Sequence, residues 1–296
     1  MKKAKILFMG TPEFARVSLE QLVGDGFEVA GVITQPDRPA GRKMVLTPPP
    51  VKEFALKKDI PVYQPESVRD ENFFGLLESV DPDVIAVVAY GKILPKYVLE
   101  YPPYGCVNVH ASLLPKYRGP NPIAAAIMDG EKTTGITTIF MDEGIDTGDM
   151  ILKEGIAIGE NETFGELHDR LASLGGIVLA KTILQIENGT AKREKQPDFG
   201  ISYTKKMDNN ICEIDQTKTA REIHDKIRGL SPSPGAFMWL DGKKLKIYKS
   251  ELISSSGGDN PLEIVREDGI VRILELQPEG GKKMGAKDFL NGRKNL

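Results

Sequence analysis

Two polar side chains that can work on a carbonyl group stand two residues apart, at positions 108 and 110. Asn108 and His110 alternate with Val107 and Val109, a pattern typical of a short strand. Residues two apart on a strand point to the same face, so the amide and the imidazole lie together. An amide donor stabilises a developing oxyanion, and an imidazole polarises the same oxygen or moves a proton. The pair predicts chemistry at a carbonyl carbon.

An acidic, glycine-containing segment at 142–149 is the second candidate. Its glycines allow a tight fold, and Asp142, Asp146 and Asp149 offer carboxylates. A carboxylate in contact with His110 would orient the ring and favour its charged form. The alternatives are a surface turn and a calcium loop, although these acids do not follow the spacing of a calcium loop. From spacing alone, an Asn–His–Asp constellation and a plain surface turn both stay open.

The elements that must position these residues follow an α/β rhythm in the first half of the chain. Apolar strands are predicted at 6–9, 27–34, 84–88 and 105–110, with helices at 14–22, 51–57 and 71–80. This alternation favours a doubly wound, mostly parallel sheet, whose ligands bind beyond the carboxyl ends of its strands. Asn108 and His110 stand at such an end. Two further strands, 135–141 and 150–158, and a long helix at 163–188 are expected to follow.

The pattern changes after residue 189. Residues 190–207 are polar and mildly basic and predict a linker. Beyond it, one helix at 219–228 precedes short strands at 236–240, 244–250, 262–266 and 270–276, a spacing typical of a small β-barrel. The sequence therefore predicts a catalytic domain at 1–189, a linker at 190–207 and a barrel domain at 208–296.

Composition excludes several classes of protein. The 296 residues carry a formal net charge of −3 and a pI near 5.8, which does not indicate a strongly basic nucleic-acid binder. The longest apolar run, 84–90, is far short of the roughly 20 residues that a membrane-spanning helix needs. Two distant cysteines, Cys106 and Cys212, predict neither a disulfide framework nor a zinc site. We expect a cytoplasmic protein with no metal and no membrane partner.

Two other segments have open interpretations. The turn at 10–13 lacks the second and third glycines of a dinucleotide fingerprint, so an NAD-dependent oxidoreductase is disfavoured. The proline-rich stretch Gln35–Pro50 contains Arg38, Arg42 and Lys43. Long loops of this kind are usually functional or disordered. These basic side chains therefore either bind phosphates or are solvated on a stiff connector.

Several long motifs carry a resemblance to a known family. The segments Asn108–Pro115, Tyr117–Gly119 and Met141–Gly148 resemble those of the folate-dependent formyltransferases. The segments Gly10–Phe14, Thr34–Arg42 and Val88–Pro95 are similar to those of members that formylate aminoacylated tRNA. The resemblance covers the full length, with Asn121-Pro122 standing where small residues are expected.

The resemblance implies a Rossmann-like formyltransferase fold followed by an OB-like barrel that binds tRNA. It also implies roles for individual residues of this chain. The implied residues are Asn108, His110 and Asp146 for catalysis, Ser112, Leu113, Leu114, Pro115, Tyr90, Ile93 and Asp142 for the reduced folate, and Arg42 and Lys43 for the tRNA.

The implied reaction moves a formyl group from 10-formyltetrahydrofolate to the α-amino group of methionine on charged initiator tRNA, for translation initiation. A monomer without a metal is expected. Two rivals stay open. One is a formyltransferase that acts on glycinamide ribonucleotide or on an amino-sugar nucleotide. The other is a non-catalytic RNA-binding protein with a degenerate Rossmann-like domain.

Overall fold

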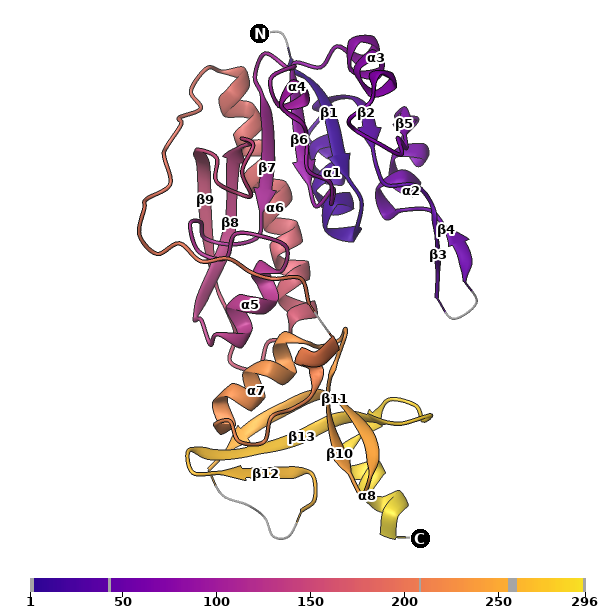
Figure 1. Ribbon diagram of the computed structural model, residues 1–296, viewed down its shortest axis with the longest axis vertical. Helices are drawn as coiled ribbons and strands as arrows, with labels where there is room; N and C mark the ends of the chain where they lie inside the picture. The colour runs from indigo at the N-terminus through magenta and orange to yellow at the C-terminus, as the bar shows by residue number, and fades with distance from the viewer. Residues whose placement is uncertain (1–2, 42–43, 208, 255–259, 295–296) are drawn as a thin grey trace. The chain divides into compact units, whose positions relative to one another are not determined.

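The computed structural model describes residues 3–41, 44–207, 209–254 and 260–294 (Figure 1). The chain forms two compact units that interleave along the sequence. The first unit comprises Met1–Arg118, Gly135–Gly155 and Asp169–Tyr203, and the second comprises Gly119–Thr134, Ile156–His168 and Thr204–Leu296. The second unit therefore takes two segments from within the predicted catalytic domain. The functional boundaries at 189 and 208 stay a prediction.

A seven-stranded sheet in the order β5-β2-β1-β6-β7-β8-β9 carries the candidate site. The pairs β1–β2, β1–β6, β6–β7 and β2–β5 are parallel, and β7–β8 is antiparallel. The predicted doubly wound, mostly parallel sheet is therefore confirmed. The strands are β1 (Lys5–Gly10), β2 (Glu28–Ile33), β5 (Val62–Tyr63), β6 (Val84–Val88), β7 (Cys106–His110), β8 (Thr133–Phe140) and β9 (Met150–Ala157). The helices up to the linker are α1 (Glu13–Gly24), α2 (Pro50–Lys57), α3 (Glu71–Val80), α4 (Lys96–Leu99), α5 (Pro122–Met128) and α6 (Phe164–Glu187).

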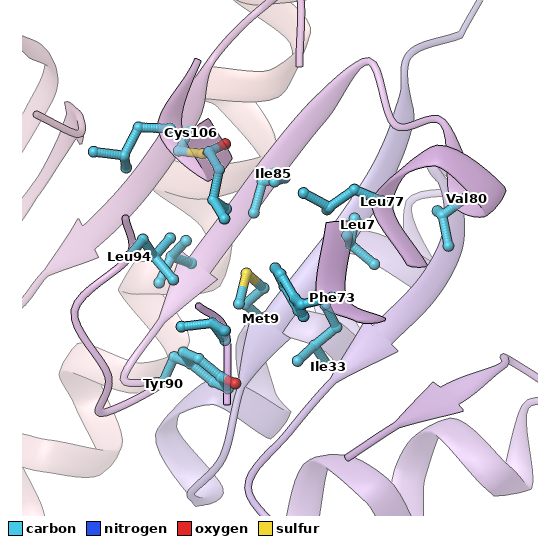
Figure 2. Packing of buried hydrophobic residues seen from close by; sticks show 14 residues of the cluster. Leu7, Met9, Ile33, Phe73, Leu77, Val80, Ile85, Tyr90, Leu94 and Cys106 are labelled. Atoms are coloured by element: carbon cyan, nitrogen blue, oxygen red, sulfur yellow. The ribbon is translucent and has the colours of Figure 1, made fainter. Parts of the chain in front are cut away.

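Helices bury both faces of the parallel strands. On one face, Met9 of β1 and Ile85 of β6 pack with Phe73 of α3 in one hydrophobic cluster (Figure 2). On the other face, α6 approaches α1 so closely that a Cβ on Gly176 would lie 2.9 Å from Cβ of Gln21. Burial on both faces explains why β6 reads as a continuous apolar run in place of an alternating one. The carboxyl end of β7, which bears Asn108 and His110, thus belongs to a sheet that is covered on both faces.

The predicted loop Gln35–Pro50 contains a small hairpin. Strands β3 (Arg38–Ala40) and β4 (Val45–Thr47) pair antiparallel, with Arg38 opposite Thr47. The root of the hairpin is anchored by Lys52, whose Nζ lies 2.8 Å from the Asp37 carboxylate and 2.7 Å from Oε1 of Gln64. Hydrogen bonds from Lys52 and Gln64 hold the pKa of Asp37 below its ordinary value. The base of the hairpin is therefore fixed by the contacts of Lys52 with Asp37 and Gln64.

The second unit is built on an antiparallel sheet in the order β10-β11-β13-β12, with β14 paired to β13. Its elements are η1 (Asn209–Cys212), α7 (Ala220–Gly229), β10 (Ala236–Leu240), β11 (Lys243–Ile253), β12 (Glu263–Arg266), β13 (Gly269–Pro278), β14 (Met284–Gly285) and α8 (Ala286–Lys294). Helix α7 begins with a capping box between Thr219 and Glu222 and packs on β11 and β13. The structure confirms a small antiparallel half-barrel after the α/β domain and adds α8, which the sequence did not predict.

A buried ionic cluster joins the elements of this second unit. Asp225 and Arg228 of α7 form an ion pair at 2.7 Å, with side chains 2% and 5% exposed. Arg228 also donates to the carbonyls of Gly159 and Glu162. These contacts explain why residues 156–168 belong to this unit. Within the described part of the chain, no helix is both long and apolar enough to span a bilayer.

Candidate active site

The structure brings Asn108, His110 and Asp146 together at the end of β7. Asn108 donates from Nδ2 to Oδ1 of Asp146 at 3.2 Å, and Nδ1 of His110 lies 3.5 Å from Oδ2 of the same carboxylate. The His110 side chain is 6% exposed and that of Asp146 is 15% exposed. One carboxylate thus contacts both residues that the strand presents on one face. The Asn108 amide keeps its second Nδ2 hydrogen for another acceptor.

The ring of His110 lies between two hydrogen-bond acceptors. Its Nε2 is 2.8 Å from the carbonyl oxygen of Tyr117, and its Nδ1 faces Asp146. A carbonyl oxygen only accepts, so Nε2 carries a proton and donates. The Asp146 carboxylate, which also only accepts, lies at Nδ1 on the other side of the ring. The two contacts fix the orientation of the ring in a buried place.

Close packing fixes the loop that bears Asp146. The residue itself has a left-handed φ of 53°, and a Cβ on Gly148 would meet the carbonyl oxygen of Phe140 at 1.7 Å. Only glycine fits at position 148. Oδ1 of Asp142 accepts from the Gly144 N–H and from the Thr147 hydroxyl, so this exposed carboxylate braces the turn. Asp142 therefore has one oxygen engaged inside the loop.

The segment 112–115, predicted to hold the folate, is largely buried. Ser112 and Leu114 are 0% exposed. The Ser112 hydroxyl donates to the Lys116 carbonyl, and the Leu114 carbonyl accepts from Nζ of Lys153 at 2.6 Å. Pro115 is buried too, and Leu113 is half-buried. Most of the segment therefore shapes the loop beside His110, and Leu113 is the one residue of the four that is not fully buried.

Tyr90 and Ile93, also predicted to meet the folate, differ in exposure. The Tyr90 ring is 2% exposed and packs in the core cluster (Figure 2). Its Oη has no hydrogen-bond partner among the residues that the structure describes. Burial raises the pKa of this hydroxyl to about 12, so it stays a neutral donor. Ile93 is 64% exposed and forms part of the surface.

A cavity of about 560 Å³ adjoins the carboxyl ends of β1 and β6. It is lined on one side by Ala89–Gly91 and on another by Arg38 and Thr47–Pro50 of the hairpin segment. Its volume lies within the range of small-molecule sites, roughly 300–1,000 Å³. The cavity thus joins the Tyr90 segment, expected to meet the folate, to the segment expected to meet the tRNA.

The two predicted tRNA contacts, Arg42 and Lys43, lie outside the described residues. The hairpin residues beside them, Met44, Val45 and Leu46, are 67%, 59% and 63% exposed. Three consecutive exposed apolar side chains are typical of an interaction surface. In the described ranges, no group of three or more His, Cys, Asp and Glu side chains could hold a metal ion.

Sequence reasoning missed the residues that brace the site from the linker. Gln196 donates from Nε2 to the carbonyls of Asp146 and Gly148, and the Tyr203 hydroxyl accepts from Arg118. Arg118 is itself 6% exposed, and its sequence motif does not predict this role. The only signal was a long side-chain amide in a segment otherwise read as solvated linker. Such a residue has no local pattern that would predict its partners.

Comparison with known proteins places the chain in a family. Residues 2–183 match the formyl transferase family, and residues 206–294 match the formyl transferase C-terminal domain. The chain is 47% identical to the methionyl-tRNA formyltransferase of Caldanaerobacter subterraneus subsp. tengcongensis, covering 97% of this chain and 96% of that protein. It is 49% identical to the methionyl-tRNA formyltransferase of Alkaliphilus oremlandii, with the same coverage.

A solved structure is similar in fold. An N-formyltransferase of Helicobacter canadensis, in complex with folinic acid and dTDP-3-aminofucose, has a TM-score of 0.68 and 24% identity. The match covers 95% of this chain and 100% of that one. At this identity the likeness shows the fold alone. The family match and the two full-length relatives show that the chain belongs to the formyl transferase family, among its methionyl-tRNA formyltransferases.

Proposed function

We propose that this chain transfers the formyl group of 10-formyltetrahydrofolate to the α-amino group of methionyl-tRNA. The observation that carries the chemistry is the contact of Asp146 with both Asn108 and His110. The full-length identity with methionyl-tRNA formyltransferases supports methionyl-tRNA as the acceptor. The reduced folate supplies the activated formyl carbon, and the chain's residues supply position and charge.

Asn108 and His110 stabilise the negative charge that develops on the formyl oxygen. The second Nδ2 hydrogen of Asn108 donates to that oxygen, and the buried ring of His110 lies beside it on the same face of β7. Asp146 holds both groups in place and helps to move a proton from the attacking amine toward the departing N10 nitrogen. A free α-amine has a pKa near ~7.7–8.0, so a useful fraction of the nucleophile is neutral at pH 7.

The folate and the aminoacyl end meet at the cavity beside β6. Tyr90–Ile93, Leu113 and the loop Asp142–Asp146 hold the pteridine in this proposal, while the buried Ser112, Leu114 and Pro115 shape the loop beside His110. Of these residues, Tyr90 and Gly91 line the cavity. The unpartnered Oη of Tyr90 fits this assignment, because a buried donor beside a cavity gains a partner from a polar ligand. Arg42 and Lys43 contact the tRNA in this proposal, next in the sequence to the exposed side chains of Met44, Val45 and Leu46.

An acceptor panel tests this function. The intact chain is given 10-formyltetrahydrofolate with methionyl-tRNA, glycinamide ribonucleotide or a dTDP-amino sugar, and formylated product is measured by mass spectrometry. We expect formylation of methionyl-tRNA alone. Formylation of the ribonucleotide or the sugar alone would refute the tRNA assignment and keep the chemistry. The enzyme works as a cytoplasmic monomer in this proposal, which size-exclusion chromatography with light scattering checks.

The barrel domain, predicted at 208–296, contributes a stacking surface for RNA. The register of β10 and β11 pairs Phe237 with Lys246 and Trp239 with Lys244. These four side chains share one face, since the intervening residues pack in the barrel core. Nζ of Lys244 lies 3.6 Å from the centroid of the Phe237 ring, and Trp239 is 52% exposed. Aromatic rings interleaved with lysines are typical of surfaces that bind nucleic acid.

Substitutions on this face distinguish binding from catalysis. For Trp239→Ala and Lys244→Ala, we expect a higher KM for methionyl-tRNA with kcat unchanged. Lys244→Ala also reduces the salt dependence of binding by about one unit of slope, because one phosphate contact is lost. Val265→Ala is the matched control, an exposed apolar residue on β12 (59% exposed). An unchanged KM and salt slope in both variants would refute this face as an RNA surface.

A further inference from the structure

The segment that follows α6 runs across the candidate active site as a strap, which we define as residues 194–203. Figure 1 shows this part of the chain passing β9 as an extended trace. At one end, Glu194 and Met150 exchange two backbone hydrogen bonds of 2.7 and 2.9 Å. At the other end, the Ser202 carbonyl accepts from the Arg118 N–H at 2.9 Å. One end of the strap is therefore attached to β9, directly after the Asp146 loop, and the other end to the loop that follows His110.

Gln196 lies between these ends and uses both atoms of its amide. Nε2 donates to the carbonyls of Asp146 at 2.7 Å and Gly148 at 2.9 Å. Oε1 accepts from Nε and Nη2 of the buried Arg118, at 3.1 and 2.7 Å. The orientation of the amide is thus fixed by a guanidinium on one side and two carbonyls on the other. The carbonyls belong to the turn that holds Asp146 in its left-handed conformation.

Ser202 supports the opposite side of the imidazole. Its Oγ accepts from the Tyr117 N–H at 2.8 Å. Tyr117 also has a left-handed φ, 62°, and its carbonyl accepts from Nε2 of His110 at 2.8 Å. The strap therefore fixes the backbone of both acceptors that flank the ring, Asp146 through Gln196 and Tyr117 through Ser202.

We propose that Gln196 and Ser202 are positioning residues that hold the His110–Asp146 pair in its reactive geometry. The inference rests on the proposed formyl transfer. Without the Gln196 amide, the carbonyls of Asp146 and Gly148 lose this donor and the loop relaxes, so Asp146 no longer contacts both Asn108 and His110. Without the Ser202 hydroxyl, Tyr117 can turn its carbonyl away from Nε2. The linker is then part of the active site as well as a connection between domains.

Kinetics provide the first test. Gln196→Ala removes the hydrogen bonds to two carbonyls of the Asp146 loop, so kcat is expected to fall by about ten- to a hundredfold. Ser202→Ala is expected to lower kcat by about tenfold, and Ser202→Thr, which keeps the hydroxyl, to restore it. KM for both substrates changes little in each variant. Asp198→Asn is the control, because this exposed strap residue has no described contact with the site.

The state of the His110 ring provides a second test that needs no formyl transfer. The chain has three histidines, so the ¹⁵N signals of His110 are assigned by comparison with His110→Gln. We expect a donating Nε2 in the intact chain and in Asp198→Asn, and shifted ring signals in Gln196→Ala and Ser202→Ala. Unchanged ring signals together with kcat within twofold of the intact chain would overturn the proposal.

The two tests separate the proposal from the function on which it rests. Failure of the intact chain to formylate any acceptor would refute the proposed function, while the ring signals would still decide the role of the strap. Where one alanine variant does not fold, the other still decides, and Gln196→Glu gives a second change at the same position. Glutamate fills the same space but cannot donate to the two carbonyls, so we expect it to lose the same contact between Asp146 and His110.

Discussion

Replacement of Asp146 by asparagine removes one charge from the centre of the site and preserves the shape of the side chain. The carboxylate lies 3.5 Å from Nδ1 of His110 and is 15% exposed. At an effective dielectric constant near ~20, a unit positive charge that develops on the ring during the reaction is attracted by the carboxylate at this distance by about 5 kcal/mol. Asparagine keeps a carbonyl oxygen that can face the ring, so we expect a loss of about 3 kcal/mol in transition-state stabilisation, or roughly a hundredfold in kcat.

The assay is single-turnover formylation of methionyl-tRNA with the folate donor in excess. Asp149→Asn is the matched control. It lies in the same loop and makes the same change of charge, but its carboxylate is 3.9 Å from Arg193 and has no described contact with Asn108 or His110. We expect the control to stay within about twofold of the intact chain. An Asp146→Asn enzyme with a rate constant within threefold of the intact chain would refute the idea that this carboxylate organises the site.

Three further predictions concern buried groups. Asp225→Ala leaves Arg228 buried without its partner, so the second unit should lose about 3–5 kcal/mol of stability. Urea unfolding measures this loss through the fluorescence of the single tryptophan, Trp239, and an unchanged midpoint would contradict the prediction. Burial lowers the pKa of His224, so the unfolded chain binds a proton that the folded unit excludes. The free energy of unfolding should therefore fall as the pH drops below about 6.5. The same fall with pH in His224→Gln would count against this prediction. Burial raises the pKa of Cys106 to about 12, so peptide mapping should find this thiol unlabelled by iodoacetamide at pH 8 until the chain unfolds.

Hydrophobic periodicity was enough to predict the framework of both units. The helix expected at 163–188 is α6 at Phe164–Glu187, and the strand expected at 84–88 is β6. The alternation of Asn108 and His110 with valines placed both polar side chains on one face, and the structure has both in contact with Asp146. These features depend on local pattern, which one sequence contains.

The strap and the boundaries between the compact units depend on contacts between distant residues. Gln196 bonds to a carbonyl 50 residues away, and Ser202 bonds to an amide 85 residues away. Residues 156–168 join the second unit because their carbonyls pair with the buried Arg228. No local propensity indicates such partners, because a polar side chain in a solvated linker and one that braces a loop look alike in the sequence.

The proline-rich stretch shows a different limit. Its prolines and basic residues indicated either a functional loop or a stiff connector, and the hairpin of β3 and β4 was not expected because each strand has only three residues. Helix α8 has two lysines and a glycine among its nine residues, a weak helical pattern that packing on β13 stabilises. In both places, tertiary contacts outweigh local preference.

Formyl transfer to methionyl-tRNA by the intact chain, Asn108→Ala and His110→Ala tests the central claim most directly. Loss of one oxyanion donor typically costs ~10²–10³-fold in rate, so we predict a fall of this size for Asn108→Ala and at least as large a fall for His110→Ala. Glycinamide ribonucleotide, run in parallel, should give no product. Formylation of methionyl-tRNA by both variants at close to the rate of the intact chain would contradict the assignment of the site.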